Sequence, residues 1–149
     1  MAPAFEKAEY DQRLARVRAE METRGLTALV IGDPANINWL TGYDAWSFYT
    51  PQMMLVELSG GPWWMGRLMD AGAARFTSWL TDDQVVAYPE TLVQRHDTHP
   101  MDWLAGWMRD NGFATARIGF ESDSYFLSPR ALAALRAGLP TASFVDADL

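Results

Sequence analysis

The chain contains no cysteine, only two histidines, and fewer basic than acidic residues. The lack of cysteine excludes disulfides, thiolate metal ligands and a cysteine nucleophile. Its net charge of −7 argues against a nucleic-acid partner, because phosphate binding requires clustered lysine and arginine. There is also no apolar run of about 20 residues that could span a membrane, and the charged first segment is unlike a secretory signal. These absences predict a soluble, cytoplasmic protein that binds neither nucleic acid nor membrane.

Sequence motifs that carry chemistry are also missing. There is no G-x-S-x-G motif for a serine nucleophile, and neither a P-loop nor a G-x-G-x-x-G fingerprint for nucleotides. The two histidines lie in the run His96-Asp97-Thr98-His99, which could be three metal ligands or a polar loop that caps a helix beginning at Pro100. We favour the cap, because no second ligand motif accompanies the run, and we predict no metal site in this chain.

Two carboxylates can likewise be interpreted either as catalytic groups or as structural groups. Glu121 and Asp123 follow a predicted strand, where open α/β sheets often place functional groups. They could act as acid and base, or they could cap the turn before Tyr125, and we favour the turn. Asp33, before Pro34, is most simply a turn residue.

The sequence does contain the patterns of a folded α/β domain. Apolar residues make up 49% of its 149 residues and aromatic residues 13%, which suits one globular domain with part of its surface covered by a partner. Periodicity and capping residues predict helices over 7–24, 69–76, 100–110 and 130–137, with a single helical turn at 36–40. Apolar runs predict strands over 26–31, 53–58, 63–66, 84–88, 117–121 and 143–145. We therefore expect a three-layer domain with a mixed, about six-stranded sheet that contains one β-hairpin and has helices on both faces.

A family resemblance rests on the stretch Asn36-Ile37-Asn38-Trp39-Leu40-Thr41-Gly42-Tyr43 and on the helix and strand before it. This stretch resembles the N-terminal domain shared by creatinase, prolidase and aminopeptidase P. The segments 44–49, 63–67 and 117–121 look most like the ectoine-hydrolase branch. The resemblance covers nearly the whole of residues 1–149, which we interpret as one domain.

The resemblance implies a non-catalytic role in a hydrolase of C–N bonds. In this family a C-terminal "pita-bread" domain holds the catalytic residues and, in many members, a divalent metal, so we expect this domain alone to be inactive. It also implies a homodimer in which the N-terminal domain covers the partner's active site. The loop after the signature would then line the small-molecule substrate with Trp46, Phe48, Tyr49 and Gln52. Creatinase has an arginine in this region for the substrate carboxylate, whereas no arginine lies between Arg24 and Arg67 here.

A different class of function is also compatible with the aromatic loop. Residues 43–52 could form the binding surface of a free-standing module that captures a small ligand or a protein.

Overall fold

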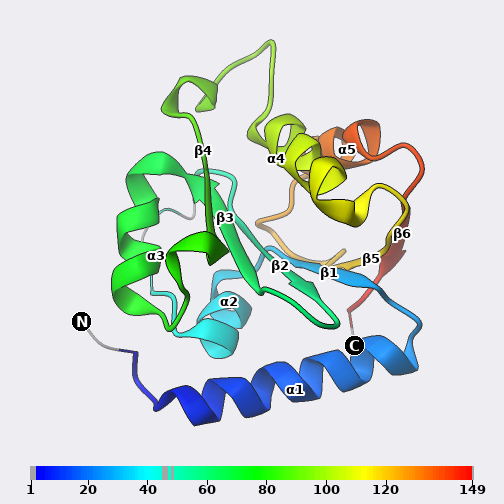
Figure 1. The fold of residues 1–149 in the computed structure, drawn as a ribbon. Helices are drawn as coiled ribbons and strands as arrows, with labels where there is room; N and C mark the ends of the chain where they lie inside the picture. The colour runs from blue at the N-terminus through cyan, green and yellow to red at the C-terminus, as the bar shows by residue number, and fades with distance from the viewer. Residues whose placement is uncertain (1–2, 45–46, 48, 149) are drawn as a thin grey trace.

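The computed structural model describes residues 3–44, 47 and 49–148, which form one six-stranded mixed sheet between two layers of helices (Figure 1). The strand order is β4-β3-β2-β1-β5-β6, and only β2 runs antiparallel to its neighbours. The strands are β1 Ala28–Ile31, β2 Met53–Glu57, β3 Trp63–Arg67, β4 Val85–Tyr88, β5 Arg117–Phe120 and β6 Ser143–Asp146. The predicted fold class and the predicted β2–β3 hairpin are confirmed.

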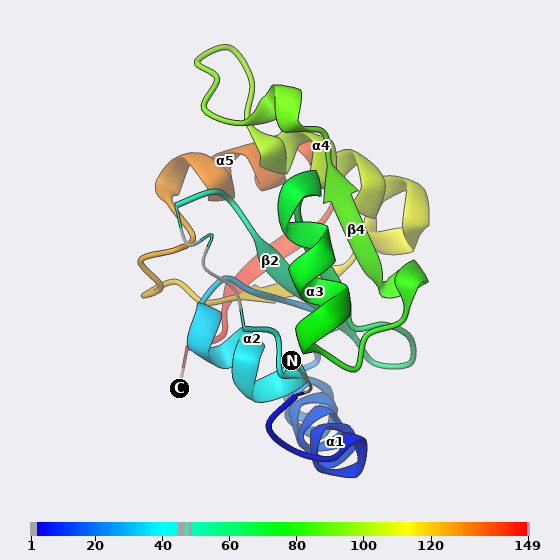
Figure 2. The ribbon, with the colours of Figure 1, turned by 90° about the vertical axis from the view of Figure 1, so that its left-hand side faces the viewer.

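The helices lie on both faces of the sheet, as Figures 1 and 2 show from two sides. One face carries α1 Lys7–Thr23, α2 Pro34–Thr41 and α3 Ala71–Thr77, and the other carries α4 Pro100–Met108 and α5 Pro129–Gly138. The described residues also form four short helical segments: η1 Leu68–Asp70, η2 Asp82–Gln84, η3 Glu90–Leu92 and η4 Arg109–Phe113. Within the described residues, no helix is long and apolar enough to cross a membrane.

Each face of the sheet has its own hydrophobic core. Trp63 and Trp64, adjacent in β3, point to opposite faces, because side chains alternate along a strand. Trp64 is fully buried in the core under α1, α2 and α3, whereas Trp63 packs against Trp107 and Phe113 on the α4 side. The adjacent tryptophans therefore belong to two separate cores.

Helix α2 is longer than the single turn expected at 36–40. Asp33 is its N-cap and accepts hydrogen bonds from the backbone N–H groups of Ala35 and Asn36, with Pro34 at the first helical position. Gly42 ends the helix with φ of 82°, a left-handed conformation that glycine adopts without strain. Asp33 and Pro34 thus start a helix, where the sequence was interpreted as a turn.

Arg13 on α1 is buried. Its Nη1 donates to the Trp39 carbonyl at 2.7 Å and its Nε pairs with Glu9, while the guanidinium lies 4.6 Å from the centre of the Phe5 ring. These contacts fix α1 against the end of α2.

The direction of β2 places several functional candidates at one edge of the sheet. Because β2 is antiparallel to β1 and β3, its first residue lies at the edge where those two strands end. The loop 43–52 before β2, the last residue of β3 and the residues after β1, β4 and β5 therefore share this carboxyl edge. Ligands of open α/β sheets commonly bind at such an edge.

Candidate functional site

The loop 43–52 contains all four side chains that the family resemblance implied as substrate-lining. Trp46 and Phe48 lie outside the described residues. Tyr49 is 61% exposed and Gln52 only 6% exposed, so the structure places these two side chains in different environments.

Gln52 lies beneath the loop and supports it. The buried Tyr43 hydroxyl donates to Gln52 Oε1 at 2.9 Å, and the Tyr43 ring packs against Trp64 with ring centres 5.4 Å apart. Burial raises the pKa of the Tyr43 phenol above its ordinary value, which keeps it protonated as a donor. Among the described residues, Gln52 Nε2 has no hydrogen-bond partner. In this chain Gln52 therefore joins the loop to the core.

A nearly buried ion pair holds the middle of the loop. Arg67, the last residue of β3, donates from Nε to Asp70 Oδ2 at 2.6 Å, and the two side chains are 11% and 13% exposed. Ser47 Oγ donates to the other oxygen of Asp70 at 2.6 Å. Arg67 Nη2 donates to Ser47 Oγ at 3.1 Å and to the Tyr49 hydroxyl at 3.0 Å. The hydrogen bond to Asp70 raises the pKa of the Arg67 guanidinium, so its charge is permanent.

Sequence reasoning missed Arg67 and Asp70. The loop itself has no arginine, but the fold brings Arg67 under it from the end of β3. Apart from the resemblance of the segment 63–67, the sequence signal was an arginine and an aspartate three residues apart, which is common in ordinary surface pairs.

Both ends of the loop are hydrogen-bonded to the segment β3–α3–β4, which also contains Arg67. The backbone N–H of Asp44 donates to Thr77 Oγ1 at the end of α3, at 3.0 Å. The Tyr88 hydroxyl at the end of β4 donates to the Pro51 carbonyl at 2.7 Å. The loop is therefore anchored at both ends and in the middle to one side of the sheet.

Glu121 has a structural role different from either predicted one. Its Oε2 accepts hydrogen bonds from the backbone N–H groups of Gly32 and Asp33 at 2.7 and 2.8 Å, and its Oε1 accepts from the Asn36 amide at 2.6 Å. Glu121 thus joins the end of β5 to the start of α2, and the prediction that it caps the turn before Tyr125 is wrong.

The turn before Tyr125 is instead held by Asp148. Its Oδ2 accepts hydrogen bonds from the Ser122 hydroxyl and from the backbone N–H of Asp123. These bonds leave the Glu121 carboxylate directed to the β1–α2 turn.

The histidine run caps α4, as the favoured interpretation predicted. His99 Nδ1 accepts from the backbone N–H of Met101 at 3.1 Å, and Asp102 accepts from the backbone N–H of His99, which forms a capping box. Asp97 pairs with Arg95. Across residues 3–44, 47 and 49–148, no three His, Asp or Glu side chains gather as a metal site would require.

The His99 cap predicts a pH dependence of stability. Burial lowers the pKa of His99, so the folded state holds a proton less readily than the unfolded chain, whose histidine pKa is about 6.5. The cap therefore stabilises the fold above about pH 6.5, and the contribution decreases as the pH falls toward the folded pKa. We expect the free energy of unfolding, measured with urea, to fall more steeply between pH 7 and 5 in the wild type than in His99→Asn, which caps without titrating. Parallel pH profiles would contradict this assignment.

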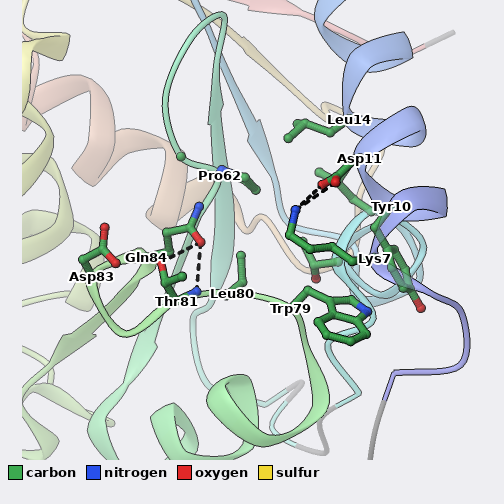
Figure 3. A pocket seen from close by; sticks show the side chains of 13 residues that line it. Lys7, Tyr10, Asp11, Leu14, Pro62, Trp79, Leu80, Thr81, Asp83 and Gln84 are labelled. Carbon is green, nitrogen blue, oxygen red and sulfur yellow. Dashed lines mark hydrogen bonds and ion pairs between the residues drawn. The ribbon is translucent and has the colours of Figure 1, made fainter.

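One surface pocket lies beside α1 (Figure 3). It has a volume of about 340 Å³ and lies between α1, the β2–β3 turn and the segment before β4. Lys7 is paired with Asp11 at 2.7 Å, and Gln84 accepts hydrogen bonds from Thr81, so these polar groups already have partners. These pairings give no sign of a catalytic centre in this pocket.

Comparison with known proteins places the chain in a family. Residues 13–149 match the Creatinase/Prolidase N-terminal domain. The chain is 47% identical over 145 residues to an ectoine hydrolase of Halomonas elongata, covering 97% of this chain and 36% of that protein. It is 38% identical over 146 residues to an uncharacterized hydrolase/peptidase of Sinorhizobium fredii, covering 97% of this chain and 37% of that protein. The chain thus spans little more than a third of these relatives.

Solved structures show the same fold. The Creatinase/Prolidase N-terminal domain of an X-Pro dipeptidase from Streptococcus pyogenes superposes with a TM-score of 0.73 at 17% identity, covering 91% of this chain and 93% of that one. The dipeptidase PepE of Mycobacterium ulcerans superposes with a TM-score of 0.70 at 22% identity, covering 95% of this chain and 35% of that one. With a fold, a domain match and close relatives in agreement, the chain belongs to the Creatinase/Prolidase N-terminal domain family.

Proposed function

We propose that this chain is the non-catalytic N-terminal domain of a hydrolase of C–N bonds, of the ectoine hydrolase, creatinase or Xaa-Pro peptidase type. It works with a C-terminal catalytic domain of its own chain and covers the active site of the partner subunit in a homodimer. The similarity to an ectoine hydrolase supports the reaction class. Among the candidate catalytic side chains considered from the sequence, those of Glu121 and His99 are engaged in structural hydrogen bonds.

An apolar surface next to the loop is the main support for the proposal. We call it the α3 surface; its members are large apolar side chains with 59 to 72% of their area exposed: Tyr49, Leu68, Met69 and Phe76. Leu68 and Met69 lie in η1 and Phe76 lies in α3, which follows η1 directly, and Gly72 between them leaves open space. Large apolar side chains gathered on one side of a domain favour a surface that a partner covers.

The position of the α3 surface favours a second subunit as that partner. Helix α3 packs against β3 and the outermost strand β4, whereas β6 is the outermost strand on the opposite side of the sheet (Figure 1). Five strand spacings of about 4.8 Å separate the two edges by about 24 Å. Because β6 runs parallel to β5 and β1, a catalytic domain that follows it starts at the carboxyl end of the sheet, at the edge strand opposite to β4 and α3. The partner's catalytic domain can then approach α3 and the loop 43–52.

In this arrangement the loop supplies contact surface and the catalytic domain supplies the chemistry. Any divalent metal would be held by the catalytic domain, as the family resemblance implies. Tyr49 has an exposed ring and a hydroxyl that is already hydrogen-bonded, so it can cover an apolar part of a small substrate and exclude water.

Complementation between subunits tests the proposal. We expect Trp46→Ala combined with Tyr49→Ala to raise the KM of the full-length enzyme for ectoine about tenfold, which equals about 1.4 kcal/mol of lost binding. A mixed dimer of this variant with a subunit inactivated in its catalytic domain should recover the low KM at half of its sites. In this dimer the intact active site belongs to the loop variant, and the inactivated subunit covers it with an intact loop.

The same mixed dimer distinguishes the alternatives. If the loop serves its own subunit, the mixed dimer keeps the raised KM. If the loop does not touch substrate, KM is unchanged in the double variant. A monomer in sedimentation velocity under assay conditions, or no hydrolysis of ectoine and other C–N substrates by the full-length protein, would also contradict the proposal. Tyr125→Ala is the matched control, because Tyr125 is 97% exposed and lies outside the α3 surface.

A further inference from the structure

The ion pair beneath the loop has no evident role in the hydrophobic cores. Arg67 and Asp70 lie at the end of β3 and in η1, and each is nearly buried. Removing two charges from water is costly, and well-packed apolar residues often stabilise a fold at least as well as a buried ion pair. A fully hydrogen-bonded polar network, in contrast, fixes one geometry. The pair is therefore better explained by the geometry that it imposes than by stability.

Both partners of the pair are directed to the loop. Asp70 uses one carboxylate oxygen for Arg67 Nε and the other for the Ser47 hydroxyl. Arg67 Nη2 is shared between Ser47 Oγ, Tyr49 Oη and Asp70 Oδ1, at 3.1, 3.0 and 3.3 Å. The two side chains thus bind two loop positions at once.

The Arg67 guanidinium holds the exposed Tyr49 side chain in one orientation. Its ring lies over the Arg67 guanidinium, 5.2 Å from ring centre to Cζ, and its hydroxyl accepts from Nη2. The side chain nevertheless keeps 61% of its area exposed. An aromatic side chain that is fixed before binding loses less conformational entropy when it covers a ligand.

We propose that Arg67 and Asp70 are positioning residues that hold Ser47 and Tyr49 so that the exposed face of Tyr49 is preset to cover the substrate. The inference rests on the proposed function of the loop. Neither Arg67 nor Asp70 touches the substrate; both act through the loop.

Steady-state kinetics of the full-length enzyme with ectoine as the probe test this role. We expect Arg67→Gln and Asp70→Asn each to raise KM about five- to tenfold with kcat within twofold, because the loop contributes binding that is equal in the ground and transition states. Arg67→Gln added to Tyr49→Ala should raise KM no further than Tyr49→Ala alone, because Arg67 acts through Tyr49. Arg75→Gln is the matched control, since Arg75 forms an exposed ion pair with Asp82 on the same unit.

Hydrogen exchange in the same full-length variants separates this inference from the proposed function. The backbone N–H of Thr50 donates to the Ser47 carbonyl, and we expect its exchange to accelerate at least tenfold in Arg67→Gln but not in Arg75→Gln. Unchanged exchange at Thr50, or a KM effect that adds fully to that of Tyr49→Ala, would overturn the positioning role. A third outcome is accelerated exchange in Arg67→Gln while KM is unchanged in both Arg67→Gln and Tyr49→Ala. It would support the positioning of the loop by Arg67 and overturn the contact of the loop with substrate.

Discussion

Replacing Trp64 with alanine is expected to lower the free energy of unfolding by about 3–5 kcal/mol, which is the cost of removing a large aromatic side chain from a packed core. Trp64 is fully buried, packs on Tyr43, and leaves no room for a side chain at Gly66. Domains of this kind are stable by only about 5–15 kcal/mol, so the change removes a large share of the total. Urea denaturation followed by circular dichroism measures the effect.

Two further variants show whether this loss comes from burial. Trp103→Ala removes a tryptophan that is 37% exposed on α4, and it should cost about 1 kcal/mol or less. Trp64→Phe keeps most of the ring and removes an indole N–H that has no hydrogen-bond partner among the described residues, so it should cost much less than alanine. Equal losses in Trp64→Ala and Trp103→Ala would show that the two-core packing is incorrect.

The second large effect is expected at Glu121. Glu121→Ala should lower the free energy of unfolding by about 2–4 kcal/mol, because hydrogen bonds to a charged acceptor contribute about 1.5–3 kcal/mol each and the loss leaves two backbone N–H groups without partners. These are the N–H groups of Gly32 and Asp33, which stand between β1 and α2. Urea denaturation again provides the measurement.

The conservative variant distinguishes structure from catalysis. Glu121→Gln keeps one acceptor oxygen and should lose about half as much stability as alanine, with kcat of the full-length enzyme unchanged. A general acid or base would instead lose a factor of about 10² to 10⁴ in kcat. Asp123→Ala, two residues further along the chain, is the control, and we expect it to change stability by less than about 0.5 kcal/mol. A large fall in kcat for Glu121→Gln would contradict the structural role.

Much of the fold could be predicted because its signals are local. Gly25 ends α1 in a left-handed conformation, and Ser128 and Pro129 begin α5, next to the predicted helix ranges 7–24 and 130–137. The alternation of Trp63 and Trp64 between two faces follows from the geometry of a strand alone. His99 could be predicted as a cap because the residues that it contacts are its neighbours in the chain.

The predictions that were wrong or missing involve contacts between distant segments. Glu121 binds residues 85 to 89 positions earlier in the chain, so its partners are not visible from its own turn. The burial of Arg13 likewise depends on the Trp39 carbonyl, 26 positions away. Local periodicity cannot predict such contacts, because they depend on which strands become neighbours in the sheet.

The sequence by itself determined the α/β class, the elements, the family resemblance and the loop as the candidate site. These depend on spacing, on caps and on a short signature, all of which are properties of neighbouring residues. Only the tertiary structure decided how the loop is held. The antiparallel β2 starts at the carboxyl ends of β1 and β3, and β3 brings the chain back to that end. Arg67 and Asp70 then reach Ser47 and Tyr49 from about 20 positions away. The ordering of a surface loop depends on which charges the sheet brings beneath it.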